Sequence, residues 1–193
     1  MRLAAATLML ASTGALAQER PRVQPTRDVT VTYRVEGAAA QAVPGGIDGP
    51  LRVSWDAAGQ RVRAAPAGRT QAVIVDLPHH TASLVDDGMR AVLALPVWPA
   101  DLPLALDGAR FTRRGAAIVA GLPCTTWAVQ ASRGNGTVCL TPDGVALRGE
   151  GTVNGRQGSF TATGVAYGSV AASLFTPPPG YFAMNFPSLG RLR

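Results

Sequence analysis

The chain alternates apolar and polar residues in short runs along most of its length. Two segments show this most clearly: their apolar positions are Val29, Val31, Tyr33 and Val35 in the first, and Leu51, Val53 and Trp55 in the second. A period of two is that of a β-strand with one buried face. Both segments are therefore predicted to be half-buried strands.

Turn-forming residues separate these runs at steady intervals. Asp86-Asp87-Gly88 and Pro142-Asp143-Gly144 are examples, because Asp and Gly tolerate the backbone conformations of tight turns. About nine or ten short strands at such spacing predict a mainly β domain, with consecutive strands antiparallel. Prolines and short lengths leave only residues 96–106 and 168–174 as candidates for one or two short helices.

Residues 1–17 have the pattern of an export signal peptide. Arg2 gives the positive start, residues 3–10 an apolar core, and Ala15-Leu16-Ala17 a small-x-small cleavage site. Cleavage there predicts a periplasmic protein, with secretion as the alternative. Residues 18–27 are polar and are expected to form a flexible leader. Residues 28–193 are expected to form one β-rich domain, in which a proline-rich segment from about 175 wraps over one end of the sheet.

After the signal peptide, no apolar run approaches the roughly 18 residues that a transmembrane helix needs. The mature chain is therefore expected to lack a transmembrane segment. Its length suits a single domain with a substantial core.

The two cysteines, Cys124 and Cys139, are expected to form a disulfide in an exported chain. A redox-active pair usually has closer spacing, as in CxxC. A turn centred on Gly134 would not place the two directly opposite each other. A bulge or an asymmetric loop is therefore expected between them.

Charge gives a weaker indication of function. All 18 basic residues are arginine and the formal net charge is +6, which is compatible with attraction to anionic lipid or acidic polymers. The arginines are scattered, however, and Arg113-Arg114 is the only adjacent pair, so charges spread over a solvated surface are the preferred interpretation. No basic helix or aromatic platform accompanies the charge, and nucleic-acid binding is not expected.

Catalytic and metal-binding patterns are weak. His79-His80 could approach Asp76, Asp86 or Asp87 across a hairpin, but exposed turn residues are the simpler interpretation. The chain has no GxSxG, HExxH, Walker or dinucleotide-binding motif. We therefore expect no catalytic residues, no metal site and no cofactor, with an unrecognised hydrolase as the alternative.

Five stretches resemble uncharacterised bacterial envelope proteins of the DUF4412 type, which are similar in turn to the LolA/LppX-like lipoprotein-carrier fold. They are QAVIVDLPHHTASLVDDGMRAVLALP, GLPCTTWAV, VCLTPDGVALR and LFTPPPGYF, together with the signal peptide. The resemblance covers roughly residues 28–186. It implies one curved antiparallel sheet, an incomplete barrel, whose concave apolar face holds acyl chains in the carriers. Those carriers cover this face with substantial helices, for which this chain offers few candidates.

Large apolar residues at alternating positions could belong either to a packed core or to such a ligand-binding face. The candidates for the apolar face are Tyr33, Val53, Trp55, Phe111 and Trp127. Two functions follow. The first is a non-enzymatic interaction or structural domain of the envelope, which engages a partner protein through edge strands or residues 175–187. The alternative is a periplasmic binder or carrier of a lipid, a lipidated protein or another apolar ligand.

Overall fold

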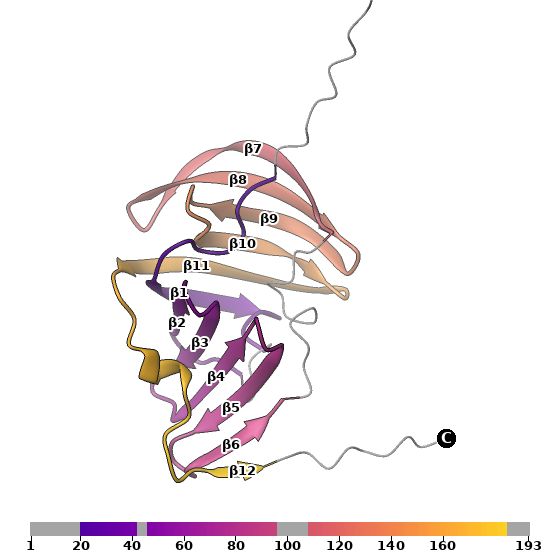
Figure 1. Ribbon diagram of the computed structural model, residues 1–193. Helices are drawn as coiled ribbons and strands as arrows, with labels where there is room; N and C mark the ends of the chain where they lie inside the picture. The colour runs from indigo at the N-terminus through magenta and orange to yellow at the C-terminus, as the bar shows by residue number, and fades with distance from the viewer. Residues whose placement is uncertain (1–19, 42–45, 96–107, 185–193) are drawn as a thin grey trace, which may run out of the picture.

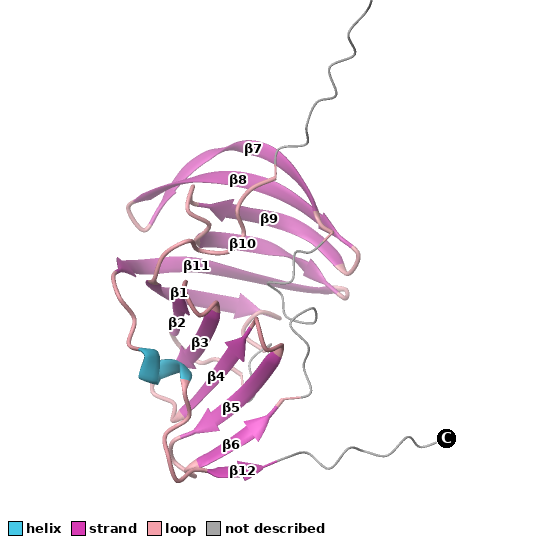
Figure 2. Ribbon diagram, viewed as in Figure 1, coloured by secondary structure: helices cyan, strands magenta, loops and turns pink. Residues whose placement is uncertain are grey.

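The computed structural model describes residues 20–41, 46–95 and 108–184, which form one β-sheet and a single short 3-10 helix (Figure 2). The strands are β1 (Val29–Gly37), β2 (Leu51–Asp56), β3 (Arg61–Pro66), β4 (Gln71–Asp76), β5 (Thr81–Asp86), β6 (Ala91–Ala94), β7 (Arg110–Val119), β8 (Leu122–Ala131), β9 (Gly134–Leu140), β10 (Ala146–Val153), β11 (Arg156–Tyr167) and β12 (Phe182–Met184), and the helix is η2 (Ala172–Phe175). The expected signal peptide and the helix candidate at 96–106 lie outside the described residues.

The twelve strands are ordered β12-β6-β5-β4-β3-β2-β1-β11-β10-β9-β8-β7. Two antiparallel meanders, β1–β6 and β7–β11, are joined where β1 pairs with β11. Figure 1 shows that the strands of β7–β11 run across those of β2–β6, as the twist of a large sheet requires. The sheet is not closed into a barrel. The prediction of a mainly β protein built on one curved antiparallel sheet is confirmed, with one parallel pair, β12 and β6, as the exception.

Two apolar clusters form the core. The first combines Val29, Val31 and Trp55 with residues of β3 to β5 and with the disulfide. The second lies on β7 to β9 and includes Phe111 and Trp127. The alternation seen in the sequence explains this arrangement, because pairs such as Val29 with Trp55 face each other across neighbouring strands.

A row of glycines crosses the β1–β9 region of the sheet. Gly136, Gly151 and Gly158 are directly paired on β9, β10 and β11, and Gly37 of β1 pairs with Gly158. A methyl group on Gly151 would overlap the carbonyl oxygen of Asn135 on the neighbouring strand. Side chains are excluded here because the backbones approach closely.

Residues 20–28 cross the β8–β10 half of the sheet, as the indigo trace in Figure 1 shows. Thr26 N–H donates to the Asp143 carbonyl oxygen at 3.0 Å, and Arg27 forms an ion pair with the Asp143 carboxylate at 2.8 Å. The Arg27 guanidinium also lies 3.7 Å from the centre of the Tyr167 ring. Val23 packs against the second cluster.

The C-terminal segment runs from β11 along β3 to the far edge of the sheet. Asp28 anchors its start, accepting hydrogen bonds from Val170 N–H at 3.1 Å and from Ala57 N–H at 2.9 Å. The Tyr181 hydroxyl anchors its end by donating to Asp87 at 2.9 Å. Between these anchors η2 buries Phe175.

Candidate functional site

Three of the five residues proposed for the apolar face belong to the first cluster. Val53 pairs with Val31, and Trp55 pairs with Val29, so these side chains share one face of β1 and β2 with Tyr33. Trp55 is 7% exposed, whereas Tyr33 and Val53 are half-buried. The three therefore lie together, as the alternation predicts.

Phe111 and Trp127 belong to the second cluster instead. Their rings meet edge to face with centroids 6.4 Å apart, and they are only 4% and 5% exposed. The five candidates thus form two neighbouring groups. Ligand binding by either group stays a prediction.

Two polar atoms within the apolar face differ in their hydrogen bonding. The Tyr33 hydroxyl donates to the Ala146 carbonyl oxygen at 2.7 Å, and burial raises the pKa of Tyr33 far above its ordinary value. This hydroxyl is therefore a neutral structural donor. Trp55 Nε1 is buried without a hydrogen-bond partner among the described residues, which is uncommon for a buried donor.

Cys124 and Cys139 form the disulfide that the sequence indicates, with Cα atoms 5.5 Å apart. The expected bulge between them was wrong. β8 and β9 pair without a register shift, and Cys139 lies opposite Thr126. The disulfide therefore joins diagonal positions of a regular ladder, and this requires no extra residue.

The histidine and aspartate motifs lie in turns. His79 is exposed, and its Nδ1 lies 2.7 Å from Asp76 Oδ1, within hydrogen-bond distance. Asp86 accepts hydrogen bonds from the Gln71 side chain and from the backbone of Met89 and Gly88, and these bonds lower its pKa. Within the described ranges, no group of three or more His, Cys, Asp or Glu residues could hold a metal ion.

The feature that the sequence did not single out is the edge strand β7. It is the last strand of the sheet and pairs only with β8 among the described strands. No other described strand pairs with its outer side, so the outward-facing backbone N–H and C=O groups of this ten-residue strand have no ladder partner in the described part of the chain. Ile118 is 75% exposed on this strand.

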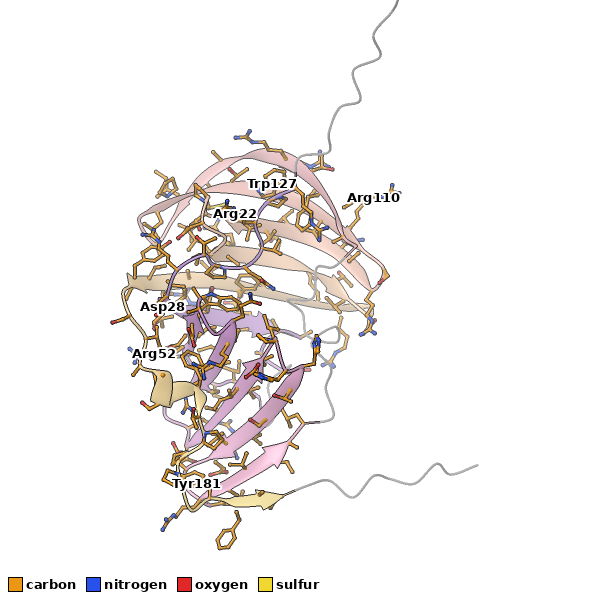
Figure 3. The ribbon with its side chains drawn as sticks, in the orientation of Figure 1. Arg22, Asp28, Arg52, Arg110, Trp127 and Tyr181 are labelled. Carbon is orange, nitrogen blue, oxygen red and sulfur yellow. A yellow bond between two sulfur atoms is a disulfide. The ribbon has the colours of Figure 1, made fainter. Side chains whose placement is uncertain are left out.

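Charge is uneven along β7. Arg110, Arg113 and Arg114 are all exposed and occupy its first half, and Figure 3 shows Arg110 projecting away from the sheet. A register shift between Arg113 and Gly115 interrupts the pairing with β8. The second half, from Gly115 to Val119, is regular and uncharged. Adjacent arginines were visible in the sequence, but their position on a free edge depends on long-range strand order.

No helix within the described parts of the chain has both the length and the apolar character needed to span a membrane.

The fold defines a protein built on one open, curved β-sheet. The chain matches no family model and no curated protein, so the DUF4412 resemblance stays a prediction.

Among solved structures, the chain is similar to an uncharacterised conserved protein from Thermus thermophilus, with a TM-score of 0.52 and 10% identity over 83% of this chain and 91% of the other. This likeness shows a shared fold. It is also similar to a LolA superfamily protein from Nitrosomonas europaea, with a TM-score of 0.38 and 10% identity over 80% of this chain and 92% of the other. MucB of Pseudomonas aeruginosa, in its complex with MucA, gives a TM-score of 0.46 and 18% identity over 77% of this chain and 55% of the other. The last two similarities are too distant to carry an argument about function.

Proposed function

We propose that the protein is an exported, non-enzymatic envelope protein that binds a protein partner, and that β7 is the strand on which an extended segment of this partner adds to the sheet. The single observation that carries the proposal is the position of the ten-residue strand β7 at the edge of the sheet, with no further strand beyond it among the described residues. Addition of a strand to a free edge is a general mode of peptide recognition, in which main-chain hydrogen bonds give the affinity.

The two halves of β7 would contact the partner in different ways. Gly115–Val119 is regular and uncharged, which suits main-chain pairing, and Ile118 offers an apolar contact. Arg110, Arg113 and Arg114 favour a partner with acidic residues beside its extended stretch, because opposite charges on an edge speed association and fix the register. The same charges oppose pairing with another copy of this basic chain.

Export is supported by the residue pattern at 1–17 and by the disulfide. Structural disulfides form and persist in oxidising compartments such as the bacterial periplasm. The Cys124–Cys139 bridge joins two neighbouring strands of the half-sheet that ends in β7. It therefore restrains the strands that position the proposed binding edge.

The experiment is photo-crosslinking from β7 in the source organism's envelope. A photoreactive residue replaces Ile118, which is 75% exposed, in one strain and Met89, which is 63% exposed in a distant turn, in another. We expect a specific adduct from position 118 alone. The captured partner is then purified, and its affinity is measured for the wild type, for Arg113→Glu/Arg114→Glu and for the control Arg148→Glu/Arg34→Glu.

The charge-reversal variant in β7 is expected to weaken binding by tenfold or more, an effect of about 1.4 kcal/mol or above, as close charge pairs at interfaces produce. The control reverses the same charge on the central strands β1 and β10 and is expected to change affinity by less than about threefold. Equal weakening by both variants would show that only the overall charge matters, and the proposal for β7 would then fail.

A second candidate function is the binding of an apolar ligand on the face of Tyr33, Val53 and Trp55. The observation that favours it is the buried Trp55 Nε1, because a ligand carbonyl oxygen could accept its hydrogen bond. Delipidated protein titrated with a fluorescent fatty-acid probe tests this. Saturable binding that Trp55→Phe weakens would support it, and no saturable binding at micromolar concentration would count against it.

A further inference from the structure

A groove lies on the opposite side of β1–β3 from the apolar face. Two adjoining depressions of about 260 and 340 Å³ form it, and they share Arg52 and Ala65. The other lining residues are Thr30, Ser54, Arg63 and Leu174 in the first depression, and Thr32, Pro50, Pro66 and Ala67 in the second. The C-terminal segment borders the groove at Leu174.

Strand register brings the polar groups of the groove together. Thr30 pairs with Ser54, and Ser54 pairs with Arg63, so the three side chains stand side by side on one face. Their neighbours in the same register are Thr32 and Arg52. The hydroxyl oxygens of Thr30 and Ser54 lie 3.1 Å apart, and Ser54 is only 5% exposed. Arg52, Arg63 and the hydroxyl pair of Thr30 and Ser54 therefore line the same depression.

The arginines of the groove are not neutralised by carboxylates of the described residues. Arg52 is exposed and takes part in no hydrogen bond or ion pair within the described part of the chain. Figure 3 shows it beside the segment between β11 and η2. Arg63 donates from Nη1 to the Leu174 carbonyl oxygen at 3.2 Å, a neutral acceptor.

Carboxylates also occur around the groove. Glu36 of β1 follows Thr32 by four residues, and the others are hydrogen-bonded or ion-paired. Asp28 accepts two backbone N–H groups, and Asp56 is held by Arg61 and by Gly59 N–H. Asp48, near the second depression, forms a 3.5 Å ion pair with Arg69. None of these carboxylates forms an ion pair with Arg52 or Arg63 within the described part of the chain.

We propose that this groove binds a phosphate group, held between the guanidinium groups of Arg52 and Arg63, with the one hydroxyl hydrogen that the Thr30–Ser54 pair leaves free as a further donor. The planar guanidinium suits phosphate because its N–H groups can donate in pairs, and these charge-assisted hydrogen bonds are among the strongest in proteins. Pro50, Ala65 and Ala67 give the second depression an apolar lining that suits the rest of the ligand. The phosphate could belong to a lipid headgroup or to a small soluble phosphomonoester.

The test uses the processed full chain with two kinds of probe, soluble phosphates and lipid vesicles. Inorganic phosphate and glycerol 3-phosphate are titrated in solution, observed by NMR, and vesicles of phosphatidylglycerol in phosphatidylcholine are compared with vesicles of phosphatidylcholine alone. Three proteins are measured: the wild type, Arg52→Gln/Arg63→Gln, and the control Arg90→Gln/Arg148→Gln, which removes the same charge from exposed positions elsewhere. Thermal melts confirm that all three fold.

We expect the groove variant to lose about tenfold or more in affinity and the control to lose less than about threefold. Binding of the soluble phosphates indicates a soluble ligand, and binding of the phosphatidylglycerol vesicles alone indicates a headgroup. If the groove variant unfolds, the double variant Arg52→Lys/Thr30→Val replaces it. The same tenfold loss of affinity is expected. The proposal is overturned if neither kind of probe binds. It is also overturned if the groove variant and the control weaken binding equally.

Discussion

The ring of Tyr33 meets the ring of Phe160 edge to face, with centroids 5.5 Å apart and planes at 88°. Tyr33 packs against the first apolar cluster and Phe160 against the second. The two residues come from β1 and β11, the strands that join the two meanders. This aromatic pair therefore links the two cores across the seam of the sheet.

A double-mutant cycle on this pair measures the link. Tyr33→Leu, Phe160→Leu and the double variant are expected to show a coupling of about 0.5–1.5 kcal/mol in the free energy of unfolding, as edge-to-face aromatic pairs do. Tyr33→Phe is the control, because it removes the bond to the Ala146 carbonyl and keeps the ring contact. Strictly additive effects in chemical denaturation would show that the rings do not couple the clusters.

The glycine row makes a second prediction. Gly151→Ala would force its methyl group against the backbone of Asn135, which cannot move without breaking the β9–β10 ladder. We expect a loss of about 1–3 kcal/mol in the free energy of unfolding, typical of overpacking. Gly164→Ala on β11 is the matched control, since no atom would contact the added methyl group. A similar stability for both variants would contradict the close approach of the strands.

Removal of the disulfide is expected to destabilise the protein appreciably. The bridge closes a loop with a sequence separation of 15 residues, for which the chain-entropy model gives about 3 kcal/mol. For a domain of this size that corresponds to a fall of roughly 6–12 °C in Tm. Calorimetry of Cys124→Ala/Cys139→Ala, with the reduced wild type beside it, checks this. An unchanged Tm would mean that the bridge constrains nothing that the sheet does not already hold.

Acid should destabilise the fold. Hydrogen bonds from Gln71 and Met89 lower the pKa of Asp86, and for Asp143 burial raises the pKa but bonds from Thr141 and Arg27 outweigh it. A carboxylate with a lowered folded pKa binds protons more weakly in the folded than in the unfolded state. Its contribution is therefore complete above about pH 5, and it falls away as the pH drops below about 4.

Melting curves at pH 7, 5, 4 and 3 measure this dependence. Asp86→Asn is expected to be less stable than the wild type at pH 7 and to lose less stability between pH 5 and 3. A variant whose acid profile runs parallel to that of the wild type would show that Asp86 does not contribute to it.

The alternation of apolar and polar residues predicted the strands, because each strand buries one of its two faces. Leu51, Val53 and Trp55 could be placed on one face from alternation alone, and the hairpin turns followed from their Asp and Gly residues. The order of the strands in the sheet could not be predicted in the same way. The pairing of β1 with β11 joins residues more than 120 positions apart, and no local pattern encodes it.

For the same reason the sequence could not show which residues gather into a site. Thr30, Ser54 and Arg63 look like ordinary outward positions of three strands, and only their register makes them neighbours. Phe111 and Trp127 were grouped with Tyr33 by residue type, yet they pack in a separate cluster. The β7–β8 hairpin reaches the first cluster only at its turn end, through Val119 and Cys124. The disulfide was predicted from the cysteines alone, but its diagonal geometry was not.

The most direct test of the proposed function is amide hydrogen exchange along β7, measured by NMR on the free protein and on its complex with the crosslinked partner. In the free protein, the outward-facing amides of Gly115–Val119 should exchange rapidly while those of β8 are protected. In the complex they should become protected, with β12 at the opposite edge unchanged. Amides of β7 that are already protected without a partner, or protection that appears only elsewhere on the sheet, would contradict the role of this edge.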